Sequence, residues 1–343
     1  MITSYQSQLV FNQMPEFSFI IPVYNRPQEV DELLTSLTKL EGEDFEVIVV
    51  DDGSEKPCSQ IVGNYSSKLP VIYHSKENTG PGLTRNFGAE KSTGSYLIFL
   101  DSDCLVPREY LNEIKQSIKS EKLDAFGGPD RALPSFTNLQ KAINYSMTSF
   151  ITTGGIRGGK KQMENYKPRS FNMGIKRDVF DDLKGFREMR FGEDIDLSIR
   201  LEKKGYKSIL IDNAYVYHRR RSSIAQFYKQ VYNSGMARIV LGQLHPGSTK
   251  LVHFLPAVFV LMVILSIGLT FLNWLFALPL ALLFAIILIN SAFINKSIFI
   301  GALSVVTSFT QLIGYGLGFS WGFVNANILG KKPAFGFEES FYN

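Results

Sequence analysis

The stretch SYLIFLDSD, residues 95–103, is an apolar run that ends in two aspartates, Asp101 and Asp103. Its β-forming residues and the turn residues around it predict a buried strand that reaches solvent at these aspartates. Two like charges this close repel each other, so a positive group should lie beside them. A divalent cation that keeps several waters and bridges to phosphates would fill that role. The alternative is a pair of solvated aspartates in a turn.

Strands and helices alternate upstream of this run. The predicted strands are FSFIIPVYN (17–25), FEVIVVDDGS (45–54) and PVIYH (70–74), and the predicted helices are an amphipathic one over residues 30–40 and GPGLTRNFGAEKS (80–92). This order predicts an α/β domain with a parallel sheet and helices on both faces. Ligands of such sheets bind at the carboxyl ends of the strands, where Asp51, Asp52, Asp101 and Asp103 fall.

Regular structure resumes after a glycine-rich stretch, TTGGIRGGKK (152–161), which predicts a mobile loop. EDIDLSIRLEKKG (193–205) predicts a helix with acidic residues in its first turn, and AYVYH (214–218) predicts a closing strand. The segment SIAQFYKQVYNSGMARIVLG (223–242) predicts a helix whose aromatic and basic faces suit a membrane surface.

The C-terminal part of the chain is almost free of charge. Leu251–Asn295 contains no Asp, Glu, Lys or Arg, and the 34 residues 297–330 contain none either. A bilayer core about 30 Å thick needs roughly 20 helical residues, so the first stretch predicts two spans joined at Asn273. The second stretch is longer than one span requires. It predicts a tilted helix, a span with an interfacial piece or a re-entrant hairpin. A helix pair in the core of a soluble protein is the less favoured alternative.

Charge and cysteine content exclude several classes of partner. The 36 Lys+Arg and 32 Asp+Glu leave a net charge of +4, too little to indicate nucleic acid. The two cysteines, Cys58 and Cys104, lack the spacing of metal ligands and indicate reduced thiols. The N-terminus has no basic-then-apolar signal pattern, so we expect the polar part to stay in the cytoplasm.

Basic residues also bear on the membrane topology. The run HRRR (218–221) and Lys250 precede the first apolar segment, as the positive-inside rule expects. After three full crossings, Lys331 and Lys332 would lie on the opposite side. This conflict favours a third segment that does not cross completely.

Five motifs occur in a characteristic order over residues 16–220. They are IPVYNRP, VVDDGS, ENTGPGLTRNFGAEKSTGSYLIFLDSD, NMGIKRDVFDDLKGFREMRFGEDIDLSIRLEKKGYK and VYH. With these motifs the chain resembles the family 2 glycosyltransferases, and the apolar segments are similar to those of membrane-anchored members. The resemblance implies a GT-A fold, a Rossmann-like and mostly parallel sheet with flanking helices, followed by transmembrane helices.

The resemblance implies a nucleotide-sugar site at the ends of the first strands. Pro22, Tyr24 and Asn25 would lie around the base and ribose. Asp52 would accept a hydrogen bond from a pyrimidine N–H, which suits an ionised carboxylate because it only accepts. Asp51 is either a ligand or a turn residue.

The segment after the third strand would continue this site. Gly80 would let the backbone approach a phosphate or ribose closely. Arg85 would reach a ribose, a phosphate or Asp101, with a plain surface arginine as the alternative.

By the same resemblance, Asp103 is the metal ligand and Asp101 contacts the ribose or sugar. The metal would be Mg²⁺ or Mn²⁺, bracing the diphosphate and taking up its charge as the sugar leaves. His218 would contact the diphosphate or the metal, with a structural histidine as the alternative.

In GEDIDL, the resemblance makes Asp194 the general base that takes the proton from an acceptor hydroxyl. A helix cap is the alternative role for Asp194. Glu193 would take the cap or contact the acceptor. Asn172 and Met173 match a stretch below the acceptor and donor sugar.

These residues imply an inverting glycosyltransferase that moves one sugar from a nucleotide diphosphate sugar to a hydroxyl of a membrane-associated acceptor, lipid-linked or glycan. The setting would be polysaccharide or glycolipid synthesis at the cytoplasmic (inner) membrane. QFYKQVYNSG departs from the Q-x-x-R-W pattern of processive synthases, which favours single addition. The alternatives are a polyprenyl-phosphate glycosyltransferase and, more distantly, a non-catalytic nucleotide-binding scaffold.

The expected organisation has four parts. Residues 1–222 form a cytoplasmic GT-A domain, and 223–250 form an amphipathic juxtamembrane segment. Residues 251–330 form a multi-pass transmembrane region of two to three helices, and 331–343 form a polar tail.

Overall fold

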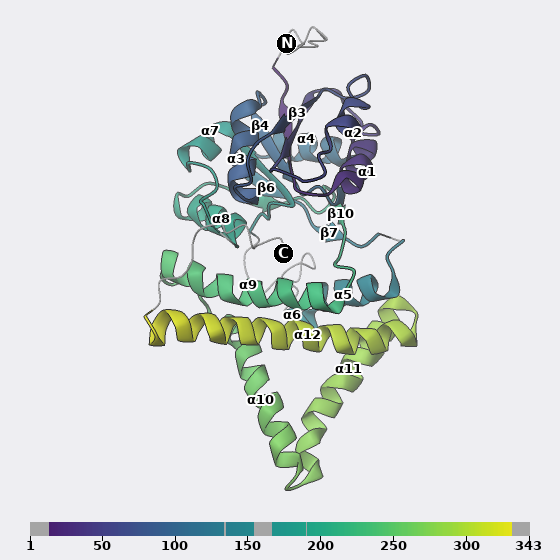
Figure 1. Ribbon diagram of the computed structural model, residues 1–343, viewed down its shortest axis with the longest axis vertical. Coiled ribbons are helices and arrows are strands. Elements are labelled where there is room, and N and C mark those ends of the chain that lie inside the picture. The colour runs from purple at the N-terminus through teal and green to yellow at the C-terminus, as the bar shows by residue number, and fades with distance from the viewer. Residues whose placement is uncertain (1–13, 134, 154–166, 190, 331–343) are drawn as a thin grey trace.

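The structure is a computed structural model that describes residues 14–133, 135–153, 167–189 and 191–330. The predicted polar tail and most of the predicted glycine-rich loop lie outside these residues. Figure 1 shows an N-terminal α/β part above a layer of long helices, with a helical hairpin extending away from both.

The main sheet has seven strands in the order β3-β2-β1-β4-β8-β6-β9. Its strands are β1 (Phe17–Val23), β2 (Phe45–Asp51), β3 (Val71–Ser75), β4 (Tyr96–Leu100), β6 (Ala125–Gly127), β8 (Asn172–Lys176) and β9 (Ser208–Leu210). The first four are parallel, while β8 runs antiparallel to both β4 and β6. The predicted parallel α/β sheet is therefore confirmed, and the carboxyl ends of β1, β2 and β4 meet at one edge.

Side chains on successive strand residues point to opposite faces of the sheet, so a strand that is apolar throughout presents two apolar faces. Helices cover both of them. On β1, Phe19 and Ile21 pack into one cluster with α1 (Pro27–Leu37), α2 (Ser59–Gly63) and α4 (Tyr110–Ser120). Ile20 packs into the other cluster with α3 (Pro81–Lys91), α7 (Arg177–Asp182) and α8 (Glu193–Lys203). This two-sided core explains why the strands are continuous apolar runs.

A second sheet brings distant segments together. It has the order β5-β10-β7, with β5 (Cys104–Leu105), β10 (Val216–His218) and β7 (Asp130–Arg131). β10 pairs antiparallel with β5, which places His218 opposite Cys104. The ending of the VYH motif therefore lies beside the residue that follows Asp103.

The remaining helical segments of the described chain lie before or after β10 in sequence. They are α5 (Asn138–Thr148), α6 (Phe150–Thr153), α9 (Ile224–Leu244), η1 (Leu251–Phe254), α10 (Leu255–Thr270), η2 (Trp274–Ala277), α11 (Leu278–Asn295), α12 (Ile298–Phe323) and η3 (Val324–Ile328). Three of the resulting helices are long and apolar enough to cross a membrane: 251–270, 274–295 and 298–328. The two helices predicted in the first uncharged stretch are both present, and Asn273 accepts a hydrogen bond from Leu275 N at 3.0 Å at the turn.

The second uncharged stretch forms one continuous helix, so it is not a re-entrant hairpin. Figure 1 shows α12 running alongside α9, across the hairpin of α10 and α11. Glycines permit this close approach: a Cβ on Gly318 would lie 2.0 Å from Tyr232 O of α9. In return, a Cβ on Gly235 of α9 would lie 2.3 Å from Tyr315 O.

Candidate active site

Asp103 lies between a strand end and a histidine brought from far along the chain. Its Oδ1 atom is 3.1 Å from His218 Nε2, and its Oδ2 atom forms an ion pair with Arg26. The backbone helps to fix this contact, because Arg219 N donates to Asp103 O at 3.1 Å. The His218 ring stacks on Phe171 with centroids 5.0 Å apart. The structure thus brings the predicted metal ligand and the predicted histidine together.

The charges around Asp103 keep it ionised. Burial alone would raise the pKa of Asp103, but the positive charges of His218, Arg26 and Arg221 outweigh burial and hold this pKa well below its usual range. For His218 the balance is reversed: burial lowers its pKa, but Asp103 and Asp130 raise it to about 9. Before any ligand binds, the pair is therefore a carboxylate facing a protonated imidazole.

The residues at this point fit a divalent cation. Ligand atoms of Asp103, Cys104 and His218 lie within 4.8 Å of one another. Asp103 Oδ1 is buried and is paired with His218 Nε2 at 3.1 Å. Burial raises the pKa of the Cys104 thiol well above its usual value, and that thiol points to Phe171 O at 3.6 Å. Mg²⁺ and Mn²⁺ prefer oxygen ligands, so the carboxylate of Asp103 is the atom that fits, with His218 beside it.

Asp101 is connected to the start of α8 through Arg85. Arg85 Nη2 donates to Asp101 Oδ1 at 2.6 Å, and Arg85 Nη1 donates to Glu193 Oε1 at 3.0 Å. The arginine is 3% exposed, and its guanidinium lies over the Phe186 ring. Arg85 is therefore not a plain surface residue; it reaches Asp101, one of the three contacts predicted for it.

Glu193 and Asp194 begin α8 and have opposite electrostatic environments. Burial and the charge of Asp194 raise the pKa of Glu193 to about 7, against the opposing effect of Arg85. Burial also acts to raise the pKa of Asp194, but Arg169, whose Nε lies 2.7 Å from Asp194 Oδ2, lowers it overall. Gly192, with φ of 80°, occupies the N-cap position, so neither acid is the cap residue of this helix.

Asp52 and Gly80 are joined in the structure. Asp52 accepts hydrogen bonds from Thr79 N at 3.0 Å and Gly80 N at 2.9 Å, and it forms an ion pair with Lys76. Gly80 has a φ of 88°, which explains the glycine. The Asp52 side chain holds the turn before α3, and contact with a nucleotide base remains a prediction.

Asp51 is a turn residue. It accepts from Ser54 N at 2.8 Å and from Tyr73 Oη at 2.9 Å, which is the second of its two predicted roles.

The end of β1 lies next to the DDGS turn. Asn25 N donates to Ser54 Oγ at 2.8 Å, and Asn25 has a φ of 53°. Pro22 and Tyr24 are partly exposed and Asn25 is exposed, so all three are accessible to a ligand. Their contact with a nucleotide remains a prediction.

Asn172 requires a correction. Its side chain is fully buried in β8, where Oδ1 accepts from Tyr110 Oη at 2.6 Å and Nδ2 donates to Ala214 O at 2.8 Å. Because both ends of the amide are used inside the core, Asn172 has a structural role and does not contact substrate. Met173 is 2% exposed and packs in the core with Phe99 and Ile175.

The run HRRR makes tertiary contacts with acids, and its role as membrane-flanking charge remains a prediction. Arg219 pairs with Glu32 at 2.6 Å, and the buried Arg220 pairs with Asp130. Arg221 is close enough for Asp103 to affect its pKa. The basic residues of this run therefore belong to the catalytic part, because tertiary contacts draw them towards acids there.

Arg26, Arg169 and Arg221 are site residues that the sequence reasoning missed. Arg26 lies inside IPVYNRP and Arg221 ends the HRRR run, so their closeness to motifs was the available signal. Nothing in the sequence near Arg169 pointed to Asp194.

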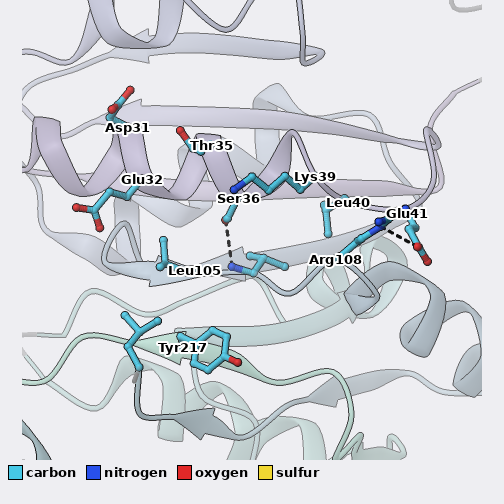
Figure 2. A pocket seen from close by; sticks show the side chains of 12 residues that line it. Asp31, Glu32, Thr35, Ser36, Lys39, Leu40, Glu41, Leu105, Arg108 and Tyr217 are labelled. Atoms are coloured by element: carbon cyan, nitrogen blue, oxygen red, sulfur yellow. Dashed lines mark hydrogen bonds and ion pairs between the residues drawn. The ribbon is translucent and has the colours of Figure 1, made fainter. Parts of the chain in front are cut away.

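An open groove of about 930 Å³ lies on the other side of the small sheet. Figure 2 shows Leu105 and Tyr217 facing Thr35 and Ser36 of α1 across it. Since neighbouring strand residues point to opposite sides, Cys104 and His218 face away from this groove. It is separate from the candidate site.

The mostly parallel sheet with helices on both faces, and the carboxylates at its strand ends, are typical of the GT-A fold. Residues 18–184 match the family profile described as Glycosyl transferase family 2. This match covers just under half of the chain.

Comparison with a solved structure supports the fold. The mannosyltransferase PcManGT from Pyrobaculum calidifontis, solved with GDP-Man and Mn²⁺, is similar over 90% of this chain and 88% of that chain. The TM-score is 0.57 and the sequence identity is 18%.

Curated relatives match over shorter stretches. The poly(ribitol-phosphate) β-N-acetylglucosaminyltransferase TarS of Staphylococcus aureus is 36% identical over 115 residues, which are 32% of this chain and 20% of TarS. The glycosyltransferase AglE of Haloferax volcanii is 27% identical over 210 residues, 56% of this chain and 63% of AglE. An uncharacterized glycosyltransferase of Rickettsia bellii is 42% identical over 26% of this chain and 13% of its own length. The chain spans less than two thirds of each of these relatives.

Proposed function

We propose that the protein is an inverting glycosyltransferase that moves one sugar from a nucleotide diphosphate sugar to a hydroxyl of a membrane-associated acceptor. The observation that carries this proposal is a chain of contacts that runs from Asp103 through His218, Asp101 and Arg85 to Glu193. Glu193 directly precedes Asp194 at the start of α8. This chain of contacts supports a single site with a diphosphate-binding end and a proton-accepting end.

At the diphosphate end, Asp103 would hold Mg²⁺ or Mn²⁺, and His218 would contact the diphosphate or, after losing its proton, the ion. When bound, the ion neutralises charge on the departing diphosphate. Arg26 and Arg221 lie near Asp103 and supply further positive charge for the same group. Pro22, Tyr24, Asn25, Asp52 and Gly80 would line the base and ribose end, where the end of β1 and the residues after it meet the DDGS turn.

At the acceptor end, Asp194 takes the proton from the attacking hydroxyl. The ion pair with Arg169 keeps Asp194 in its ionised form, which is the form a base requires. While Arg169 is paired with Asp194, the Asp194 carboxylate has a low affinity for protons. An acceptor that loosens this ion pair would make Asp194 a stronger base. Glu193 holds Arg85 in place and so keeps the two ends together.

The acceptor is lipid-linked or a glycan, in polysaccharide or glycolipid synthesis at the cytoplasmic membrane. Three apolar helices directly follow the glycosyltransferase part, which supports a reaction close to the bilayer. Residues 1–222 form the cytoplasmic catalytic part, 223–250 the juxtamembrane segment, 251–330 the membrane region and 331–343 a polar tail.

The test is a donor screen on the purified full-length chain. Nucleotide diphosphate sugars are added with and without Mn²⁺ or Mg²⁺, and the rise in melting temperature is measured, because a ligand that binds the folded state stabilises it. The donor that protects only with metal is then supplied with membrane lipid extract, and release of free nucleoside diphosphate is followed. No metal-dependent protection by any donor would contradict the proposal.

Two rivals give different results in the same assays. A polyprenyl-phosphate glycosyltransferase acts on an acceptor that is already ionised and needs no general base. A non-catalytic scaffold binds nucleotide but releases no nucleoside diphosphate with lipid extract.

A further inference from the structure

The three apolar helices do not run in one direction. Figure 1 shows α10 and α11 as a hairpin that points away from the catalytic part, while α12 lies across the base of that hairpin beside α9. The two helices of the hairpin, with their leading η1 and η2 turns, have 20 and 22 residues. At 1.5 Å per residue, each is about 30 Å long, which matches the core of a bilayer.

Contacts along α12 fix its direction independently of the view. Near its start, a Cβ on Gly301 would lie 2.7 Å from Leu288 O of α11. Further on, a Cβ on Gly316 would lie 2.3 Å from Pro256 O, at the first turn of α10. These two glycines are about 22 Å apart along the helix. α12 therefore bridges the two arms of the hairpin and does not run parallel to them.

The middle of α12 is attached to the catalytic part. Thr307 Oγ1 lies 2.6 Å from Ser146 Oγ and 3.1 Å from Ala142 O, both on α5. Gly318 contacts Tyr232 of α9. A helix that crossed the bilayer would leave α5 and α9 within a few turns, but α12 stays against them along its length.

Exposure shows where lipid is expected. At the tip of the hairpin, Phe271 is 88% exposed, Leu272 80% and Trp274 67%. Tryptophan is enriched at the level of lipid headgroups, so this tip fits the far surface of a bilayer. α12 itself exposes Phe299, Val306 and Trp321.

We infer that only α10 and α11 cross the membrane, and that α12 lies with α9 in the plane of the near interface. The partner of this surface is a phospholipid bilayer. The chain then crosses twice, so the end of α12 returns to the side of the catalytic part. The conflict raised by Lys331 and Lys332 disappears, because they follow two crossings and not three.

Cysteine labelling tests this topology and needs no knowledge of the sugar or acceptor. Three single variants are made: Pro246→Cys before the hairpin, Asn273→Cys at its tip and Leu329→Cys at the end of α12. The native chain serves as the control, because Cys58 and Cys104 are both buried. A membrane-impermeant maleimide is applied to sealed vesicles of each orientation.

The expected result is that Pro246→Cys and Leu329→Cys are labelled from one side and Asn273→Cys only from the other. Labelling of Leu329→Cys from the side of the tip, or from neither side, would overturn the inference. Labelling of Asn273→Cys and Pro246→Cys from the same side would also overturn it, because the hairpin would then not cross.

A second inference rests on a different observation, a buried ionic joint between α8 and α9. Asp196 on α8 is completely buried, and its Oδ1 atom is 2.8 Å from Nε2 of His245, the C-cap residue of α9. Arg187 and Arg200 complete the pairing of Asp196 at 3.0 Å and 2.8 Å. His245 is 3% exposed.

The start of α8 also rests on α9. A Cβ on Gly192, the N-cap residue, would lie 3.2 Å from Leu241 Cδ1 of α9. Glu193 and Asp194 directly follow Gly192, so α9 packs against the turn that carries both acids. One turn further along α8, the contact between Asp196 and His245 attaches α8 to α9 a second time. Among the described residues, the side chains of Asp196 and His245 form their hydrogen bonds and ion pairs with each other and with Arg187, Arg200 and Lys203, none of which is proposed to touch substrate.

We propose that Asp196 and His245 are positioning residues that fix Asp194 relative to the membrane-facing helix, an inference that rests on the proposed function. Misplacing a reacting group by about 1 Å can cost a hundred-fold in rate. We therefore expect His245→Ala to lower kcat about ten-fold or more while the KM for the donor stays unchanged.

The conservative variant separates positioning from stability. His245→Gln keeps a side-chain N–H donor for Asp196 and should recover most of kcat. Lys204→Ala, which removes an exposed pair with Asp182 at the end of the same helix, is the matched control and should leave kcat unchanged. A fall in melting temperature with normal kcat in His245→Ala would overturn the proposal. A kcat of His245→Gln no higher than that of His245→Ala would also overturn it. Absence of turnover in the unmodified protein would instead refute the proposed function.

Discussion

Asp103 Oδ1 lies 3.1 Å from His218 Nε2, and the two side chains form a buried ion pair between the end of β4 and β10. The contact therefore joins the two sheets at the point where a cation and a diphosphate would bind.

Replacing Asp103 should remove metal-dependent turnover. A metal ion contributes several kcal/mol to such a reaction, so Asp103→Asn should lower kcat/KM more than about a hundred-fold. Asp124→Asn is the control. Asp124 lies outside the candidate site and pairs with Lys176, with Nζ and Oδ1 3.6 Å apart. Steady-state release of nucleoside diphosphate at varied Mn²⁺ measures both. Equal losses in the two variants would contradict a specific role for Asp103.

Asp194→Asn distinguishes the two classes of acceptor. With a hydroxyl acceptor, loss of the base should lower kcat about a hundred-fold or more, because general-base catalysis contributes roughly 10²–10⁴. With a phosphate acceptor, kcat should stay near normal. Turnover is measured on lipid extract, and donor protection against unfolding shows that the variant still binds its donor.

Arg169 should set the acid limit of activity. It lowers the pKa of Asp194 against the effect of burial, so Arg169→Gln should raise that pKa. The protonated base is inactive; the acid limb of the pH profile of kcat should therefore move to higher pH. The same change removes stability that the ionised Asp194 contributes above its unfolded pKa and that is lost as pH falls. An unshifted acid limb would show that another group controls it.

Removing Arg85 should destabilise the whole site. Arg85→Met leaves Asp101 and Glu193 without their shared cation, and breaking a buried pair in this way costs about 3–5 kcal/mol. Arg108→Gln, at the exposed pair with Glu41, should cost only about 0–1 kcal/mol. Denaturant unfolding compares the two variants, and similar midpoints would rule out the bridging role.

Gly318 should be essential to the pairing of α9 and α12. Its Cβ would lie 2.0 Å from a backbone oxygen, so Gly318→Ala should force the helices apart and cost about 1–3 kcal/mol. Gly268→Ala on α10 is the control, because nothing lies within 4 Å of its added Cβ. Melting temperatures in detergent should fall for the first variant alone. A normal melting temperature for Gly318→Ala would mean that this contact tolerates separation.

Several features could be predicted because they depend on neighbouring residues in sequence. Apolar runs followed by DDGS and DSD predicted β2, β4 and the acids at their ends, since strand length and turn chemistry are local properties. The uncharged stretches predicted apolar helices of membrane length by the same reasoning. Arg26, Arg169 and Arg221 were missed because their partners are acids on other elements.

The sequence by itself determined the succession of strands and helices along the chain, the aspartates at the strand ends and the apolar character of the C-terminal region. Periodicity and composition act over short distances, so these features are local. Only the tertiary structure decided that His218 faces Asp103, that Asn172 turns into the core and that α12 lies across the hairpin. Those outcomes depend on strand pairing, on packing and on which buried polar atoms find partners. Such choices are made between segments far apart in the chain, where local patterns carry no information.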